Sequence, residues 1–311
     1  MKIPHQLSRP SKNASMKYRR LEGQIVEVKD GDSNGIVPTV RTPLLSVLQD
    51  NPPDHSDPLK RGLPFQPRSY RDFMLFENHY SASLAGFTQI HRPVISWIAA
   101  AYTGITGWRY PGFKPGILWS QQPIFYQSNH LAFYADEAPI QYPKYCKYLD
   151  LELELGVLLG GHLFNATAEE AKSAIAGFCV FNDFSVRNVQ VAEMNSGFGP
   201  QHSKCFANSV SSIVVSADEI MPRIERLTGR VIINGQVVQE CSTDRWQFTV
   251  AEAIAHVSQS TRLYPGEFFG TGTFPLGAGI EHARFQLKVG DVVRLEIDGI
   301  GSVTNKIIAD E

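Results

Sequence analysis

Alternation of hydrophobic and polar residues is the main pattern along this chain after residue 68. Residues 230–240 and 292–308 alternate with a period of two, and each run breaks at a turn dipeptide, Asn-Gly at 234–235 and Asp-Gly at 298–299. A two-residue period places successive side chains on opposite faces of a strand, and these dipeptides suit tight turns. The pattern therefore predicts two β-hairpins.

Helical periodicity is restricted to short segments. Thr167 and Thr249 each stand three residues before a glutamate, which is the spacing of a capping box, and predict helices over 168–176 and from residue 250. Residues 42–48 predict one short helix and residues 23–29 a strand. Hairpins with only a few helices indicate an α+β, mostly β fold, in which an antiparallel or mixed sheet closes on itself.

A proline-rich segment divides the chain. Residues 51–67 contain five prolines and are typical of an extended linker. We therefore expect residues 1–68 to form a small N-terminal extension with its linker, and residues 69–311 to form the main domain.

Composition and charge exclude several classes of protein. The 311 residues are 43% hydrophobic and 19% charged, with a formal net charge of −2, so neither nucleic acid nor a membrane surface is an expected partner. The start lacks the apolar region of a secretory signal, and the most apolar stretch, 94–105, is too short to span a bilayer. The four cysteines have no CxxC spacing, which argues against a zinc ribbon and for a reducing, cytoplasmic location.

Two glutamates alternate with leucines in residues 149–159. On a strand, Glu152 and Glu154 would share one face, while Leu151, Leu153 and Leu155 would share the other. One interpretation is a solvated strand face. The other is a buried pair with a cation between the carboxylates, because burying two like charges without one is costly.

Further candidate residues lie in residues 177–190 and at Lys204. An apolar strand runs into Asp183, and Arg187 and Gln190 are three residues apart, so a helical turn would place them on one side. The alternative is a capped turn with a surface arginine. Lys204 is either a solvated charge or the neutralising cation of a carboxylate-rich site.

The segment after the linker also carries candidate chemistry. Asp72, Glu77 and His79 fall close together, although a lone histidine is more often structural than catalytic. Many aromatic residues follow in 97–134, which indicates either a hydrophobic pocket or lid, or buried structural rings.

Several spaced motifs occur in the order seen in fumarylacetoacetate hydrolases. These are the Glu-x-Glu strand at 152–154, NDxSxRxxQ at 182–190, Ser-Lys at 203–204, PGEFFGTGTFPLG at 265–277 and LKVGDVVRLEIDGIG at 287–301. The chain resembles this family from about Ser69 to its C-terminus. The resemblance implies a mixed β-roll with the active site at its mouth, a homodimer, and one Mg²⁺, with Mn²⁺ or Ca²⁺ as alternatives.

The resemblance also implies roles for individual residues. The implied metal ligands are Asp72, Glu152, Glu154 and Asp183. The implied catalytic groups are His79 as general base, with Arg187, Gln190 and Lys204 binding the substrate oxygens. Tyr126 and Thr273 are the implied substrate contacts. The glutamate that would orient the histidine has two candidates, Glu77 and Glu281.

The function implied is that of an enzyme with a small carbonyl substrate. Hard oxygen ligands select Mg²⁺, Mn²⁺ or Ca²⁺ over zinc, and such an ion can stabilise the enolate formed when a carbon–carbon bond breaks. We expect a hydrolase acting on a β-diketone or acylpyruvate. The alternatives are a decarboxylase or enol–keto isomerase of an α-keto acid, and a non-catalytic ligand-binding module. The chain lacks GxSxG and P-loop motifs, and no GxGxxG follows a strand.

Overall fold

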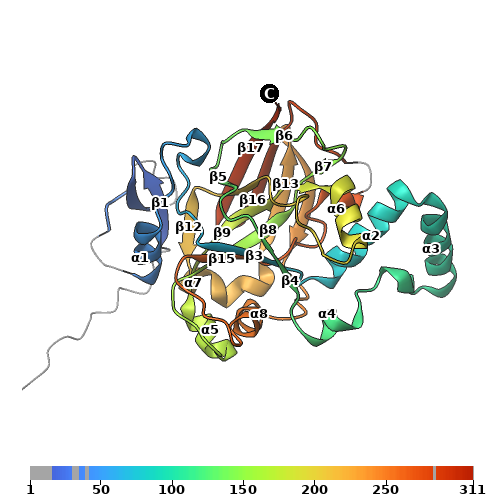
Figure 1. Cartoon of the computed structure of the whole chain (residues 1–311), viewed down its shortest axis with the longest axis horizontal. Coiled ribbons are helices and arrows are strands. Elements are labelled where there is room, and N and C mark those ends of the chain that lie inside the picture. The colour runs from blue at the N-terminus through green and yellow to red at the C-terminus, as the bar shows by residue number, and fades with distance from the viewer. Residues whose placement is uncertain (1–15, 30–34, 39–41, 283–284, 311) are drawn as a thin grey trace, which may run out of the picture.

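Two β-sheets form the centre of the molecule (Figure 1), in a computed structural model that describes residues 16–29, 35–38, 42–282 and 285–310. The larger sheet has ten strands within this part of the chain. Its main path runs β2 (Gln24–Val28), β1 (Lys17–Leu21), β12 (Ile213–Ser216), β9 (Ile175–Asp183), β8 (Leu153–Leu159), β15 (Glu267–Gly270), β3 (Ser69–Phe73) and β4 (Phe125–Ser128). Off this path, β11 (Asn208–Val210) pairs with β9 and with β5 (Phe133–Tyr134). The pairs β15–β3 and β11–β5 are parallel and the others antiparallel, so the predicted mixed sheet is confirmed.

The second sheet contains both predicted hairpins. Its order is β14 (Gln236–Ser242), β13 (Thr228–Ile233), β16 (Val292–Ile297), β17 (Gly301–Ala309) and β6 (Ile140–Tyr142). Asn234 and Gly235 both have positive φ in the first turn, and Gly299 does in the second, as tight hairpin turns require. A two-stranded pair, β7 (Leu149–Asp150) with β10 (Ser185–Val186), completes the sheets of the described residues.

Short helices surround these sheets. They are α1 (Pro43–Asp50), α2 (Glu77–His91), α3 (Pro93–Thr106), α4 (Ile117–Gln121), α5 (Ala168–Ala174), α6 (Arg187–Asn195), α7 (Ala217–Ile220) and α8 (Val250–Val257). Short 3₁₀ turns are η1 (Pro58–Lys60), η2 (Pro111–Phe113), η3 (Met221–Arg226) and η4 (Gly279–His282). Both predicted capping boxes are confirmed, at Thr167 for α5 and Thr249 for α8. No helix in the described ranges is long and apolar enough to cross a membrane.

The N-terminal residues extend the larger sheet. Strand β1 pairs antiparallel with β12, and β2 continues from β1. The proline-rich segment 51–67 contains only the turn η1, but Leu63 and Phe65 are fully buried in the core. The segment therefore packs against the main domain. Burying its apolar side chains is more favourable than leaving them in solvent, as they would be in a free linker.

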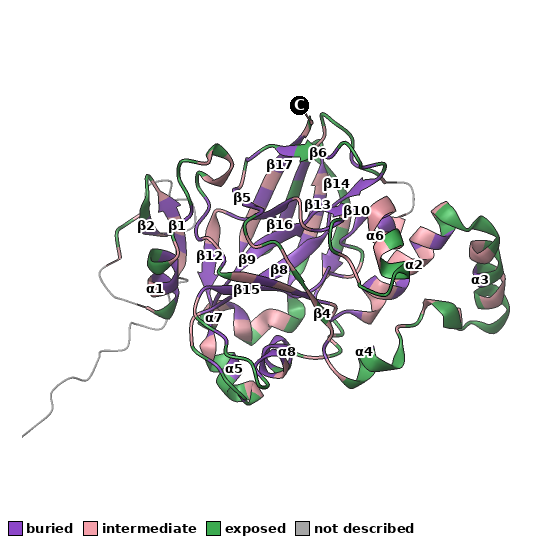
Figure 2. Ribbon diagram, in the orientation of Figure 1, coloured by how far each residue is buried: buried purple, intermediate pink, exposed green. Residues whose placement is uncertain are grey.

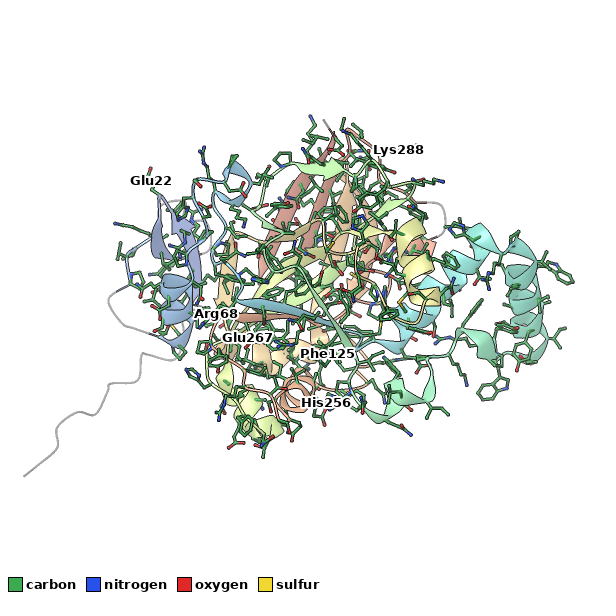
Figure 3. The ribbon with its side chains drawn as sticks, viewed as in Figure 1. Glu22, Arg68, Phe125, His256, Glu267 and Lys288 are labelled. Atoms are coloured by element: carbon green, nitrogen blue, oxygen red, sulfur yellow. The ribbon has the colours of Figure 1, made fainter. Side chains whose placement is uncertain are left out.

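The centre of the larger sheet is buried on both faces. Figure 2 shows this centre in purple and the helix α3 mostly in green, where α2 and α3 project from one side of the molecule. Every residue of β8 and β9 is buried, and the predicted leucine face of residues 151, 153 and 155 packs in the main hydrophobic cluster. Phe125, labelled in Figure 3, marks the edge strand β4. Polar groups on these central strands thus lie in a dry environment, where charges interact strongly.

Candidate metal centre and active site

Three carboxylates meet where the central strands lie side by side. Asp72 comes from β3, Glu154 from β8 and Asp183 from the end of β9, and one oxygen of each lies within 4.8 Å of the others. Strand β15 lies between β3 and β8, and its Gly270 is opposite Asp72. A Cβ atom at Gly270 would lie 2.1 Å from Asp72 Oδ1 and 2.6 Å from Glu154 Oε2. Only glycine there leaves room for the carboxylates to converge.

Burial strongly changes the acidity of this triad. It raises the pKa of Asp72 to about 8, with the charge of Asp183 adding to the effect. Burial and the neighbouring Asp72 raise the pKa of Glu154 well above its usual range. Burial also raises the pKa of Asp183 to about 6, although Lys204 opposes this shift. The triad therefore favours protons or a cation over three bare negative charges.

The donor atoms fit a hard divalent cation. Asp72 Oδ1 and Asp183 Oδ1 are buried and have no hydrogen-bond partner. Unpaired buried carboxylate oxygens are costly, and an ion bound between them would remove that cost. Carboxylate oxygen is the preferred ligand of Mg²⁺, Mn²⁺ and Ca²⁺, so Asp72, Glu154 and Asp183 suit such an ion.

Lys204 and Tyr126 contact the triad through Asp183. The Nζ atom of Lys204 lies 2.5 Å from Asp183 Oδ2 and 2.5 Å from Glu152 Oε2, and the Tyr126 hydroxyl donates to Asp183 Oδ2 at 2.5 Å. Burial lowers the pKa of Lys204, but Asp183 and Glu152 outweigh this and raise it overall. Lys204 is thus a permanently charged, buried ammonium group rather than a solvated one.

Glu152 lies beside the triad, between two cations. Its Oε1 is 2.8 Å from Arg187 Nη1, while its Oε2 contacts Lys204. Burial raises its pKa, but Lys204 and then Arg187 outweigh burial and lower the pKa overall. As the helical spacing suggested, Arg187 Nη1 also donates to Gln190 Oε1, at 2.9 Å. Both oxygens of Glu152 therefore bind cationic side chains, and its role as a metal ligand stays a prediction.

His79 lies in the first turn of α2 and is buried. Its Nδ1 is 3.3 Å from Glu281 Oε1, and the Glu281 carboxylate also accepts the backbone N–H groups of Leu276 and Ala278. Glu77 instead lies 3.5 Å from Arg109 and is half-exposed. Of the two candidates, the structure thus places Glu281 next to the histidine.

The segment after β15 closes around Glu154. The backbone N–H of Gly272 donates to Glu154 Oε2 at 3.1 Å, and the Thr273 hydroxyl donates to Oε1 at 3.4 Å. Thr273 is buried and contacts a triad residue, so it helps to orient Glu154.

The aromatic segment does not act as one unit. Trp119 and Phe133 are buried, which fits the structural interpretation. Trp97 and Trp108 are 72% and 74% exposed, so within this chain they neither line a pocket nor pack in the core. They lie on and just after α3, which projects with α2 away from the sheets (Figure 1).

Sequence reasoning missed two groups that touch the site. Asp150 is fully buried and binds Arg187, with its Oδ2 2.7 Å from Nε. Glu193 accepts the backbone N–H groups of residues 201–203 and so holds the loop before Lys204. Asp150 stands two residues before Glu152 on the same alternating run, which was an available signal. The contact of Glu193 depends on the folded loop.

Comparisons with known proteins agree on one family. Residues 114–308 match the family model of the fumarylacetoacetate hydrolase C-terminal domain, a range that includes Glu152, Glu154 and Asp183 but not Asp72 or His79. A Burkholderia cenocepacia protein named "Putative hydrolase" is 36% identical over 171 residues, which are 52% of this chain and 57% of that protein. The chain thus matches little more than half the length of this relative.

Solved structures show the same fold. A fumarylacetoacetate hydrolase from Exiguobacterium antarcticum is 19% identical, covers 95% of this chain and 100% of its own, and has a TM-score of 0.67. A 2-hydroxyhepta-2,4-diene-1,7-dioate isomerase from Mycobacterium marinum is 26% identical, covers 61% of this chain and 70% of its own, and has a TM-score of 0.53. The first likeness supports the fold alone, and the second adds a relative with isomerase chemistry.

Proposed function

Because the chain belongs to the fumarylacetoacetate hydrolase family, we propose that it is a divalent-metal-dependent hydrolase that cleaves a carbon–carbon bond in a β-diketone or acylpyruvate. The observation that carries this proposal is the buried triad Asp72, Glu154 and Asp183, with two unpaired oxygens. A dry, acidic cluster of this kind is expensive to maintain without a cation. Its proximity to a buried lysine supports chemistry on a negatively charged or carbonyl-bearing substrate.

Asp72, Glu154 and Asp183 would hold the ion, with Mg²⁺ first and Mn²⁺ or Ca²⁺ as alternatives. When bound, the ion would supply positive charge beside the substrate carbonyl oxygens, where negative charge develops as the bond breaks. Glu152 is the proposed fourth ligand. Calorimetry on Glu152→Ala tests this role, because unchanged Mg²⁺ affinity would leave Glu152 solely as the anchor of Lys204 and Arg187.

The remaining groups have roles in proton transfer and substrate binding. Nδ1 of His79 lies 3.3 Å from Glu281 Oε1, so this carboxylate would hold the ring proton on Nδ1 and leave Nε2 free to take a proton from the attacking water. Lys204 and Gln190 would donate to the substrate oxygens, as would Arg187. Tyr126 contacts Asp183 and Thr273 contacts Glu154, and both side chains would line the substrate site.

Decarboxylation or enol–keto isomerisation is the second candidate. It is favoured by the isomerase from Mycobacterium marinum, whose sequence is 26% identical. The two candidates share the metal site, but only hydrolysis requires an activated water. Mass spectrometry of products from acylpyruvates, β-diketones and oxaloacetate, with Mg²⁺ and with chelator, tests the choice. Two cleavage products that form with Mg²⁺ but not with chelator support the hydrolase. An isomer, or loss of CO₂, supports the alternative. Mg²⁺ binding with no turnover of any substrate would favour a ligand-binding module.

The family resemblance also leads us to propose a cytoplasmic homodimer. The composition of the chain agrees with a cytoplasmic location, because its four described cysteines are all free thiols. Sedimentation velocity at micromolar concentration tests the assembly, and a monomer there would remove that part of the proposal.

A further inference from the structure

Asp150 is a fully buried carboxylate for which the proposed chemistry has no direct use. Its Oδ2 accepts from Arg187 Nε at 2.7 Å, lies 2.6 Å from Arg187 Nη2, and accepts the backbone N–H of Ile280 at 2.9 Å. Its Oδ1 accepts the backbone N–H of Leu151 at 2.9 Å. One oxygen thus joins an arginine of the site to the turn η4.

The contact between Asp150 and Arg187 extends to the carboxylate cluster. A guanidinium group is planar, so a carboxylate that holds Nε and Nη2 also fixes the direction of Nη1. That third nitrogen lies 2.8 Å from Glu152 Oε1 and 2.9 Å from Gln190 Oε1. Asp150 therefore determines where Arg187 holds Glu152, which in turn contacts Lys204.

The contact between Asp150 and the turn η4 extends to His79. Ile280 is followed by Glu281, the residue next to His79 Nδ1. A Cβ at Gly279 would lie 2.2 Å from Asp150 Oδ1, and a Cβ at Gly86 of α2 would lie 1.8 Å from the Ile280 carbonyl oxygen. The carboxylate, the turn and the helix that carries His79 are therefore packed together without spare room.

From these contacts we propose that Asp150 is a positioning residue. Through Arg187 it fixes Glu152 and Lys204 relative to the His79–Glu281 pair. The expected effect on catalysis rests on the proposed function, but the expected effect on the position of His79 does not. Asparagine cannot replace Asp150. In one orientation its amide NH₂ faces the N–H of Leu151, in the other it faces Arg187 and Ile280, and in both the charge that holds Arg187 is lost.

A double-mutant cycle with His79→Ala tests the coupling. Asp150→Asn should lower kcat on the best substrate by about 10–100-fold, the usual effect of removing a partner that orients a metal site. Because both changes act on one unit, the combined loss should fall short of the product of the single losses by at least about fivefold. Asp136→Asn is the control, since Asp136 is a partly buried carboxylate that accepts from Thr304 and Ser212 elsewhere. If the loss of kcat in the double variant equals the product of the losses in the two single variants, the proposal is wrong.

The second measurement does not depend on turnover. In the metal-free protein, ¹⁵N spectra of His79 should show the ring proton on Nδ1, the nitrogen 3.3 Å from Glu281 Oε1, and Asp150→Asn but not Asp136→Asn should alter that signal. Identical His79 spectra in wild type and Asp150→Asn would refute the geometric coupling, even if no substrate were turned over. If Asp150→Asn does not fold, Asp150→Glu serves in both measurements. It keeps the charge for Arg187, but its extra methylene pushes the carboxylate against Gly279.

Discussion

Binding of Mg²⁺ to the metal-free protein should release protons at pH 7, about one of them from Asp72. Burial raises the pKa of Asp72 to about 8, so this carboxyl holds a proton at this pH, and burial also raises the pKa of Glu154 well above its usual range. Asp183, with a pKa of about 6, is mostly ionised. Metal ligands must be deprotonated, so the ion has to displace the proton of Asp72 and any proton that Glu154 holds.

The size of the repulsion explains why the protons stay until a cation replaces them. Two unit charges 4.8 Å apart repel by about 3.5 kcal/mol at an effective dielectric constant of about 20. The triad contains three such pairs, and the nearest cation, Lys204, contacts only Asp183 among its members. Full ionisation without a metal is therefore unfavourable.

Titration calorimetry in buffers of different ionisation enthalpy measures the proton count. The logarithm of the Mg²⁺ affinity should also rise with pH near pH 7, by about one per pH unit from Asp72 alone. Glu154→Gln should bind more weakly and release fewer protons, while Asp136→Asn should match the wild type. Tight Mg²⁺ binding without proton release would refute the assignment of these carboxylates as ligands, and so would an unchanged proton count in Glu154→Gln.

Three further predictions concern the base, its orienting group and stability. His79→Ala should lower hydrolysis by roughly 10²–10⁴-fold in steady-state assays and leave Mg²⁺ affinity within about twofold, because a general base is lost but no ligand. Glu281→Gln should reduce the same rate by at least about tenfold through the loss of His79 orientation, whereas the half-exposed Glu77→Gln should keep near-full activity; the reverse order would exchange their roles. The metal-free protein should become less stable to urea as the pH rises from about 4 to about 8, because the folded state binds the Asp72 proton that the unfolded chain has already lost. Saturating Mg²⁺ should remove this slope, because Asp72 is then ionised in both states. A metal-free protein that gains stability over this range would contradict the shift.

Local sequence signals predicted most of the individual elements. The capping boxes at Thr167 and Thr249 specify helix starts through contacts within four residues, and the turn at 234–235 specifies its hairpin in the same way. The alternating glutamates and leucines also predicted that Leu151, Leu153 and Leu155 share one face, because a strand has only two faces, but they left open whether the glutamates face solvent or a buried cation.

The partners of the site residues could not be predicted in this way. Whether Glu77 or Glu281 meets His79 depends on how α2 packs on η4, about 200 residues further along the chain. The need for Gly270 follows from the register of β15 between β3 and β8, which no local pattern specifies. Likewise, the exposure of Trp97 follows from the projection of α3, which hydrophobicity alone would have buried.

The order of the buried charges indicates where an ion would bind. Asp150, Arg187, Glu152, Lys204 and Asp183 form a row of alternating sign, in which each neighbour pair is in contact. Alternation is what makes the burial of five charges tolerable, since every carboxylate has a cation beside it. Asp72 and Glu154 continue the cluster beyond Asp183, but within the described part of the chain neither has an ion-pair partner. A row that ends in three converging carboxylates lacks a cation at that end, and a divalent cation there would complete the alternation that the side chains begin.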